Sequence, residues 1–408
     1  MSGLTDAVYR VLDRRLASQS KRPLALALSG GGDSVALTLI AGEWARLQGR
    51  QLLCLTVDHG LNPASQDWTA TCSRLASKVG ADFQSMSWTG EKPSTGLPAA
   101  ARLARHTLLA EAARKAGASV ILMGHTASDL AESAAMRAAG STTPDAREWA
   151  PSPVWPEGRD VFLLRPMLGL SRSDLRTWLQ GQAASWIEDP ANVDLRYARS
   201  RARSHPGMEG APGHLPQRQI PHDLARQVQE DFGLVMDRRT LRDADPAAAA
   251  ALVGVACVSA GGGVKLPRSD RLMRLTQALR GAREVTMTLS GCQVIADETA
   301  IRWVRASGDI ARSGAPDLEL SPGETGVWDG RYEVTSSTPT RISNLGRHRS
   351  SHMALARIRL RDVPVQARGG LPCLQGSCVA PGPETVVRSL ILQRFRAAAG
   401  LIDRELAA

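Results

Sequence analysis

A run of small and polar residues, Ser29-Gly30-Gly31-Gly32-Asp33-Ser34, follows the apolar stretch 24–28 and precedes a segment with helical periodicity. Three successive glycines allow the backbone to turn with its N–H groups facing a ligand, and the start of the following helix adds a dipole that favours an anion. The run has neither the Gly-Lys-Ser/Thr of a Walker loop nor the G-x-G-x-x-G of a dinucleotide fold. It predicts a phosphate-binding loop of a different kind.

Polar residues also follow two other apolar runs. Asp58-His59-Gly60 comes after the run 52–57, and the segment 124–133, GHTASDLAES, comes after the run 120–123. In open α/β sheets, ligands bind outside the carboxyl ends of the strands. We therefore expect these side chains to lie at the same edge of the sheet as the phosphate loop.

The fold that would bring these residues together is a doubly wound parallel α/β sheet. The three runs are almost wholly apolar, as strands buried on both faces must be, and amphipathic segments of helical length lie at 35–47, 64–79 and 99–116. Several prolines predict that 141–160 is a long loop without regular structure. We expect this α/β domain, which carries the phosphate loop, to occupy residues 1–215.

The rest of the chain is expected to form smaller modules after a proline- and glycine-rich linker. At 216–318 we expect an α+β module, in which Asp245 caps a helix that begins at Pro246 and in which 284–289 and 299–304 form paired strands. At 319–408 we expect a β-rich module that ends in an amphipathic helix at about 383–398.

The composition indicates a soluble protein with a basic surface. The 408 residues include 50 basic and 40 acidic side chains, a formal net charge of +10, and most of the basic residues are arginine. Arginine binds phosphate through two hydrogen bonds, which suits a nucleic-acid partner, but a preference for arginine codons would give the same ratio. The sequence predicts no membrane span, no secretory signal and no cysteine metal centre, so a cytoplasmic protein without membrane contact is expected.

The glycine loop, with serine at both ends, resembles the pyrophosphate loop (PP-loop) of the N-type ATP pyrophosphatases, which adenylate a carbonyl-type oxygen and release pyrophosphate. Within this superfamily, the ordered motifs are similar to those of the tRNA(Ile)-lysidine synthetases. These motifs are SGGGDS at 29–34, VDHG at 57–60, ARLAR at 101–105, GHTASDLAES at 124–133, LRPML at 164–168, and WIEDPAN at 186–192 followed by Arg199 and Arg203. The resemblance covers 24–203 well and 267–304 weakly.

The resemblance implies a two-step reaction that uses ATP and Mg²⁺. ATP activates the 2-oxygen of the wobble cytidine of tRNA(Ile) with the anticodon CAU, and the ε-amine of free L-lysine then displaces AMP to give lysidine. An adenylated oxygen leaves as AMP, which is a far better leaving group than oxide. The resemblance also implies that the two smaller modules contact the tRNA and that the protein forms a homodimer.

The resemblance assigns roles residue by residue. Asp33 is expected to hold Mg²⁺ on the β,γ-phosphates, because a hard oxygen ligand beside phosphate suits that ion. Asp129, with Glu132, is expected to hold the α-ammonium of lysine while the other amine attacks. The expected catalytic residues are Asp33, Asp129 and Arg102. The expected ATP-binding residues are Ser29, Gly30, Gly31, Gly32, Asp33, Ser34, Asp58, His59 and His125. The expected tRNA-binding residues are Arg105, Arg199, Arg201 and Arg203, for which a solvated surface is the alternative.

Three positions depart from the family pattern. Thr126, Ser128 and Ser200 stand where the family has a histidine, an aspartate and an asparagine. These changes leave open a catalytically weak homologue that only binds nucleotide or tRNA. A tRNA thiolase is a further alternative, although the N-terminal domain offers only Cys54 and Cys72 for sulfur transfer.

Overall fold

The computed structural model describes residues 3–138, 140, 146–188, 220–313, 316–345, 363–375 and 385–407. Contacts between residues divide the chain into two compact units. The first unit comprises 1–217 together with 402–408, and the second comprises 218–401. The expected boundary at 215 is close to the division at 217, but the last seven residues lie with the first unit.

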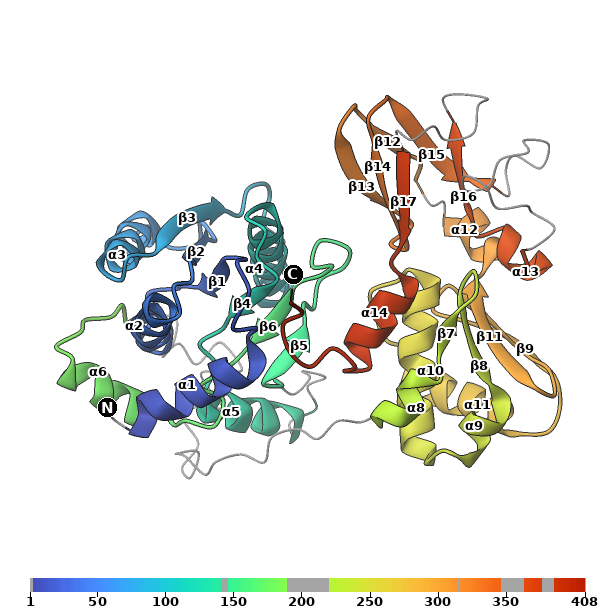
Figure 1. Ribbon diagram of the computed structural model, residues 1–408, viewed down its shortest axis with the longest axis horizontal. Coiled ribbons are helices and arrows are strands. Elements are labelled where there is room, and N and C mark those ends of the chain that lie inside the picture. The colour runs from blue at the N-terminus through green and yellow to red at the C-terminus, as the bar shows by residue number, and fades with distance from the viewer. Residues whose placement is uncertain are drawn as a thin grey trace. The chain divides into compact units, whose positions relative to one another are not determined.

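A six-stranded sheet forms the centre of the first unit (Figure 1), with the strand order β3-β2-β1-β4-β6-β5. The strands are β1 (Leu24–Ala27), β2 (Leu52–Asp58), β3 (Asp82–Ser87), β4 (Val120–Leu122), β5 (Trp149–Pro151) and β6 (Phe162–Leu164). All neighbouring pairs are parallel except β5 with β6. The chain moves outward from β1 through β2 and β3 and then returns to the other side at β4. The doubly wound α/β fold is thus confirmed, and its topological switch point lies between β1 and β4, where such folds bind ligands.

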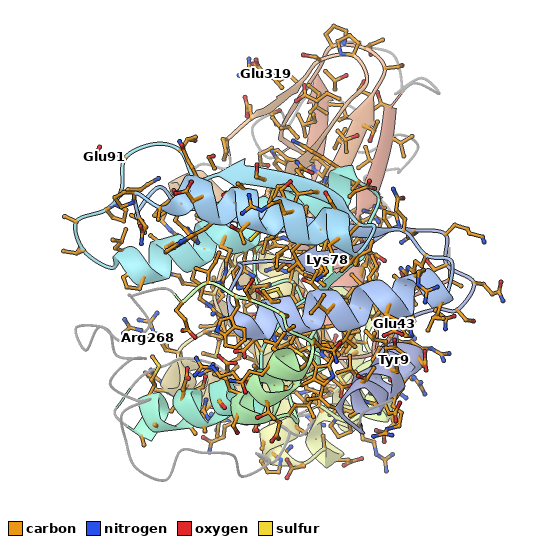
Figure 2. The ribbon with its side chains drawn as sticks, turned by 90° about the vertical axis from the view of Figure 1, so that its left-hand side faces the viewer. Tyr9, Glu43, Lys78, Glu91, Arg268 and Glu319 are labelled. Carbon is orange, nitrogen blue, oxygen red and sulfur yellow. The ribbon has the colours of Figure 1, made fainter. Side chains whose placement is uncertain are left out.

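Helices cover this sheet. They are α1 (Gly3–Arg15), α2 (Gly32–Leu47), α3 (Ser65–Lys78), α4 (Leu97–Lys115), α5 (Ala127–Ala138) and α6 (Arg172–Gly181). The Trp44 indole on α2 donates a hydrogen bond of 2.8 Å to Asp13 on α1, and Figure 2 labels Tyr9 and Glu43 on the same two helices. Helix α6 packs against α2 and thereby comes close to the phosphate loop.

Three strands of the sheet were not predicted, namely β3, β5 and β6, of which β6 is a buried run of only three residues. β3 is an edge strand whose side chains are mostly exposed, so it lacks the apolar pattern of the buried strands. β5 lies within 141–160, where we expected no regular structure, and that expectation is wrong for 149–151. Pro151 is tolerated there because β5 is also an edge strand, whose outer N–H groups need no ladder partner.

The second unit contains a five-stranded antiparallel sheet with the order β7-β8-β11-β10-β9. Its strands are β7 (Gln229–Glu230), β8 (Leu234–Asp237), β9 (Val285–Leu289), β10 (Cys292–Ala296) and β11 (Ala300–Arg305), and its helices are α8 (His222–Arg226), α9 (Arg238–Asp243), α10 (Pro246–Gly261), α11 (Ser269–Arg280) and α12 (Ser307–Ser313). As predicted, the Asp245 side chain caps α10, accepting bonds from two backbone N–H groups. The strands expected at 284–289 and 299–304 correspond to β9 and β11. They do not pair with each other, because β10 lies between them and pairs with both.

The remainder of the second unit is built from two three-stranded sheets, β12-β15-β16 and β13-β14-β17. The elements are β12 (Leu318–Leu320), β13 (Glu324–Trp328), β14 (Tyr332–Ser336), β15 (Thr340–Asn344), α13 (Val365–Arg368), β16 (Pro372–Gln375), β17 (Thr385–Ser389) and α14 (Ile391–Ala398). The helix expected from about 383 therefore begins at Ile391, because the alternating residues before it form a strand.

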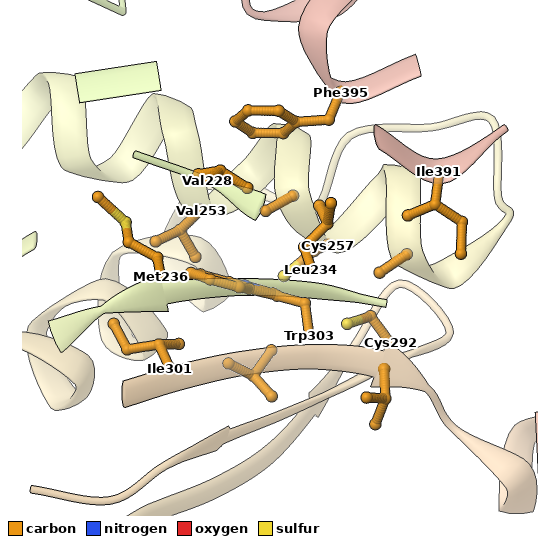
Figure 3. Close-up of a cluster of buried hydrophobic side chains, with 14 of the residues drawn as sticks. Val228, Leu234, Met236, Val253, Cys257, Cys292, Ile301, Trp303, Ile391 and Phe395 are labelled. Atoms are coloured by element: carbon orange, nitrogen blue, oxygen red, sulfur yellow. The ribbon is translucent and has the colours of Figure 1, made fainter. Parts of the chain in front are cut away.

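One hydrophobic core runs through the second unit. It includes Trp303 on β11, Cys257 on α10 and Phe395 on α14, as Figure 3 shows. The same cluster continues to Val334 and Ile342 in the small sheets. The modules expected at 216–318 and 319–408 therefore share a core over their described residues. No helix within the described segments is long and apolar enough to cross a membrane.

Candidate functional site

The phosphate loop connects β1 to α2 at the switch point of the sheet. Gly30 has a φ of +83°, in the left-handed region that favours glycine, and a Cβ on it would lie 2.4 Å from Ile187 Cδ1. The Ser34 hydroxyl accepts a bond from Ser29 N and donates one to the carbonyl of Gly31. Gly31 caps α2 without a side chain. The first backbone N–H groups of α2 consequently have no side-chain cap that competes with an anion.

The segment after α6 covers this loop. Ile187 N donates a bond of 2.9 Å to the carbonyl of Gly30, and a Cβ on Gly32 would lie 3.5 Å from the Trp186 ring. Trp186 is itself held by a bond of 2.6 Å from its indole to Glu188. The tryptophan motif noted in the sequence thus packs on the phosphate loop, and Gly30 is the position where both the backbone conformation and the approach of Ile187 favour glycine.

Three carboxylates predicted to act in the site converge on one arginine. Asp33 at the start of α2 and the two acids of α5, Asp129 and Glu132, all contact Arg172 at the start of α6. The guanidinium lies 3.0 Å from Asp33 Oδ2, 3.0 Å from Glu132 Oε1 and 3.6 Å from Asp129 Oδ1. Burial raises the pKa of Asp33 and Arg172 opposes that shift, while the same three carboxylates raise the pKa of Arg172. Sequence analysis placed these acids together but missed the arginine.

The two departures from the family pattern that the structure describes have contacts in this group. Thr126 donates to Asp129 Oδ2 from its backbone N–H at 2.8 Å and from its hydroxyl at 3.0 Å. The Ser128 hydroxyl accepts a bond of 3.4 Å from the backbone N–H of Arg172. Thr126 therefore orients one predicted lysine-binding carboxylate, and Ser128 helps to fix the start of α6.

His125 lies at the carboxyl end of β4, next to a buried arginine. Its Nδ1 accepts a bond of 2.8 Å from Arg165 Nε. Burial, with Arg165, lowers the pKa of His125 to about 3. The imidazole is therefore neutral at physiological pH, and because Nδ1 is an acceptor, Nε2 carries the proton. His125 can offer this N–H to a ligand but cannot supply positive charge.

The positive charge beside His125 comes from arginines. Arg102, Arg105 and Arg165 each contribute to lowering the pKa of His125 or His106, so all of them lie within electrostatic reach of these rings. Arg102 and Arg105 are one helical turn apart on α4, as the sequence predicted. The site therefore has an acidic part around Arg172 and a basic part around Arg165.

A second buried histidine makes the stability of the first unit sensitive to acid. Burial and the nearby arginines lower the pKa of His106 to about 2, from an ordinary value of 6.5. The unfolded chain binds this proton below pH 6.5 and the folded chain does not, so folding stability falls as the pH drops from 6.5. Between pH 6.5 and pH 5, the loss from one such group is about 2 kcal/mol. We expect urea unfolding to show a smaller acid loss for His106→Gln than for the wild type; equal losses would contradict this origin.

The end of β2 lies within electrostatic reach of the basic part of the site, because burial and then Arg105 lower the pKa of His59. Asp58 Oδ1 accepts a bond of 2.7 Å from Gly60 N, and the carbonyl of Asp58 accepts one of 2.8 Å from Trp88 N. The rings of His59 and Trp88 meet edge to face at 6.0 Å, and Lys92 Nζ lies 4.0 Å from the Trp88 ring centre. This aromatic and basic group could contact a nucleobase. Trp88 was not singled out from the sequence, although it directly follows a strand and lies four residues before Lys92 in the loop.

Several predicted residues lie outside the part of the chain that the structure describes. These residues are Arg199, Arg201 and Arg203, for which we expected tRNA contacts, and Ser200.

Comparison with known proteins shows what this chain is similar to. A family model described as a PP-loop domain matches residues 4–206. The chain is 45% identical to a tRNA(Ile)-lysidine synthase of Caulobacter vibrioides, with 98% of each chain covered. It is 34% identical to a tRNA(Ile)-lysidine synthase of Rhizobium meliloti, over 78% of this chain and 74% of the relative. Among solved structures, a U34-tRNA thiolase of Methanococcus maripaludis aligns with a TM-score of 0.42 at 15% identity, covering 50% of this chain and 75% of that chain.

Proposed function

This chain belongs to the tRNA(Ile)-lysidine synthase family, and we infer that it ligates lysine to C2 of the wobble cytidine in tRNA(Ile) with the anticodon CAU. The similarity over nearly the full length to the Caulobacter relative carries this conclusion. The PP-loop domain implies that ATP drives the reaction. The products are lysidine, AMP and pyrophosphate, formed in the cytoplasm through a cytidine adenylate.

The acidic and basic parts of the site suit the two halves of this reaction. The uncapped start of α2 would bind the pyrophosphate portion of ATP. Asp33, at this helix start, would hold Mg²⁺, which neutralises phosphate charge when it is bound. The neutral His125, with its Nε2–H, and the arginines Arg102 and Arg165 supply donors for charge that develops on the phosphoryl group. The adenylation step therefore depends on electrostatic stabilisation of the phosphoryl group, and His125 does not need to transfer a proton.

Lysine would bind at the acidic part. Asp129 and Glu132 are almost completely buried on α5 and offer negative charge to an ammonium group. Holding the α-ammonium there leaves the ε-amine free to attack C2 of the adenylated cytidine. The same chemistry would exclude amino acids whose second amine is too short to reach the cytidine.

The proposed activity is tested by incubating the full-length protein with tRNA(Ile) of anticodon CAU, labelled lysine and ATP. We expect lysine to enter the tRNA with formation of AMP and pyrophosphate, and we expect no transfer to methionine tRNA with the same anticodon. ATP-dependent adenylation without lysine transfer would favour a different modifying enzyme. Failure of both steps would favour the alternative of a homologue that only binds nucleotide or tRNA.

The role of Asp129 predicts a difference between the two half-reactions. Replacing Asp129 with Asn removes the negative charge but keeps an oxygen that can accept from Thr126. A charge-assisted hydrogen bond contributes about 1.5–3 kcal/mol, so we expect lysine transfer to slow by roughly tenfold to hundredfold. Adenylation should change much less. Accumulation of adenylated tRNA, measured against lysine incorporation, checks this; equal loss in both steps would contradict it.

We also propose that Arg105 and the arginines at 199, 201 and 203 bind tRNA, with further contacts from the second unit and with the enzyme acting as a homodimer. Neutralising Arg199, Arg201 and Arg203 together should weaken tRNA binding. It should also flatten the dependence of log K on log salt by up to about 0.7–0.9 for each phosphate that the variant no longer neutralises. ATP binding should stay unchanged, because another segment forms the phosphate loop. A titration at several salt concentrations that gives an unchanged slope would indicate a solvated surface.

A further inference from the structure

Arg172 connects residues that serve different steps of the proposed reaction. Its Nε bonds to Asp33 of the phosphate loop, and its terminal nitrogens reach Glu132 and Asp129 of the proposed lysine site. The side chain is 22% exposed, so solvent and small ligands can reach it. One guanidinium thus holds carboxylates from two helices in a single arrangement.

The charges in this group indicate what Arg172 does. Three carboxylates contact one guanidinium in a partly buried space, so negative charge exceeds positive charge among the contacting groups, and such a space attracts cations even though Arg165 and Arg176 also act on Asp129 and Asp33. The Asp129 oxygen that faces Arg172 is Oδ1, because Thr126 engages Oδ2. An ammonium group that approaches this side of Asp129 must therefore compete with the arginine already there.

We propose that Arg172 is a positioning residue, a resident cation that keeps Asp129 and Glu132 oriented in the empty enzyme and yields them to the ammonium group of the incoming lysine. The inference rests on the proposed function, since it assumes that lysine is the cation received. Its cost is weaker binding of lysine, because each new contact replaces an existing ion pair. Its benefit is that two buried carboxylates keep a cation in direct contact before lysine binds, which offsets the cost of burying their charge.

The packing of α6 supports a positioning role. Ser171 caps the helix by accepting a bond of 3.1 Å from Asp174 N, and the backbone N–H of Arg172 is held by Ser128. The base of the Arg172 side chain is consequently fixed while its guanidinium can exchange partners. Arg176, one turn further along α6, forms an exposed ion pair with Glu188 and has a weaker electrostatic effect on Asp33 than Arg172 has, so it serves as a control for a positive charge on the same helix.

The test is direct binding of labelled lysine to the full-length protein without ATP or tRNA, by equilibrium dialysis. Because a competing charge is removed, Arg172→Gln should bind lysine about tenfold more tightly than the wild type. Arg172→Lys keeps the charge and should stay within about threefold of the wild type. Arg176→Gln should match the wild type.

Steady-state kinetics supply the second measurement. Arg172→Gln should lower the KM for lysine, because the competing charge is gone. It should also lower the kcat of lysine transfer by at least about tenfold, because carboxylates without Arg172 bind the ammonium group but do not orient lysine for attack on the cytidine. Arg172→Lys, whose single amine cannot reach three carboxylates, should lose kcat without gaining affinity.

Unchanged or weaker lysine binding in Arg172→Gln would overturn the proposal. If Arg172→Gln does not fold, full kcat in Arg172→Lys overturns it. A wild-type protein that transfers no lysine would instead refute the proposed function, which separates the two failures.

Discussion

Replacing Asp33 with Asn is expected to reduce AMP formation by about a hundredfold or more, the cost of removing one preorganised electrostatic stabiliser. Asp33 lies at the first turn of α2, beside the backbone N–H groups that would bind pyrophosphate. In the proposed mechanism its carboxylate holds Mg²⁺ on those phosphates, and an amide oxygen binds that ion much more weakly. The loss should appear in the first half-reaction, measured as release of labelled AMP and pyrophosphate.

A matched control separates this effect from a general change of charge. Asp67 also lies in the first turn of a helix, α3, but its side chain is exposed. Asp67→Asn should keep AMP formation near the wild-type rate. Thermal unfolding of Asp33→Asn should stay close to that of the wild type, because its main partner, Arg172, keeps two other carboxylates. A folded Asp33→Asn enzyme with normal AMP release would remove Asp33 from the mechanism.

The sequence predicts best those strands whose residue types are determined mainly by burial. β1, β2 and β4 are central strands buried on both faces, and this requirement produces the continuous apolar runs by which they were identified. β3 and β5 lie at the edges of the same sheet, where burial constrains the side chains less. Their existence depends on the neighbouring strand, and a neighbour in space cannot be identified from local sequence.

In the candidate site, too, residues in local motifs were predicted and a residue brought in by tertiary packing was not. The phosphate loop is a local motif, and Asp129 and Glu132 follow a recognisable strand, so the acids were predicted from short segments. Arg172 lies 139 residues from Asp33 in the chain, and only the packing of α6 on α2 brings the two together. Nothing in the sequence around Arg172 distinguishes it from an exposed arginine at the start of a helix.

Glu405 also depends on a partner far away in the sequence. It is a buried acid near the end of the chain, and the last residues belong to the same compact unit as the N-terminal part. Its carboxylate accepts two hydrogen bonds from Arg50, at 2.6 and 2.8 Å, and one of 3.0 Å from Ala17 N. The side chains of Glu405 and Arg50 are 0% and 4% exposed. Neighbouring contacts hold the same segment, including a bond of 2.9 Å from the Trp149 indole to the carbonyl of Ile402. The chain therefore passes to the second unit near 217 and returns to the first at 402.

Removing this carboxylate should destabilise the N-terminal unit strongly. Glu405→Gln leaves the Arg50 guanidinium buried without a compensating charge, and breaking a buried ion pair in this way costs about 3–5 kcal/mol. We expect a large decrease in the free energy of unfolding, measured by urea denaturation with the Trp149 environment as the probe. Arg14→Gln, which breaks an exposed pair with Glu148, should cost less than about 1 kcal/mol.

A double variant identifies the cause of the loss. Replacing both partners with apolar residues, Arg50→Met with Glu405→Leu, removes the unpaired charge together with the ion pair, and such replacements are often neutral or stabilising. We expect the double variant to recover most of the stability that Glu405→Gln loses. If the double variant is as unstable as the single one, the bonds from Ala17 and Ser20 to Glu405 hold the segment instead of the charge pair. If Glu405→Gln unfolds like the wild type, the ion pair with Arg50 does not stabilise the first unit, and the remaining contacts, such as those of Ile402 and Asp403, hold the segment.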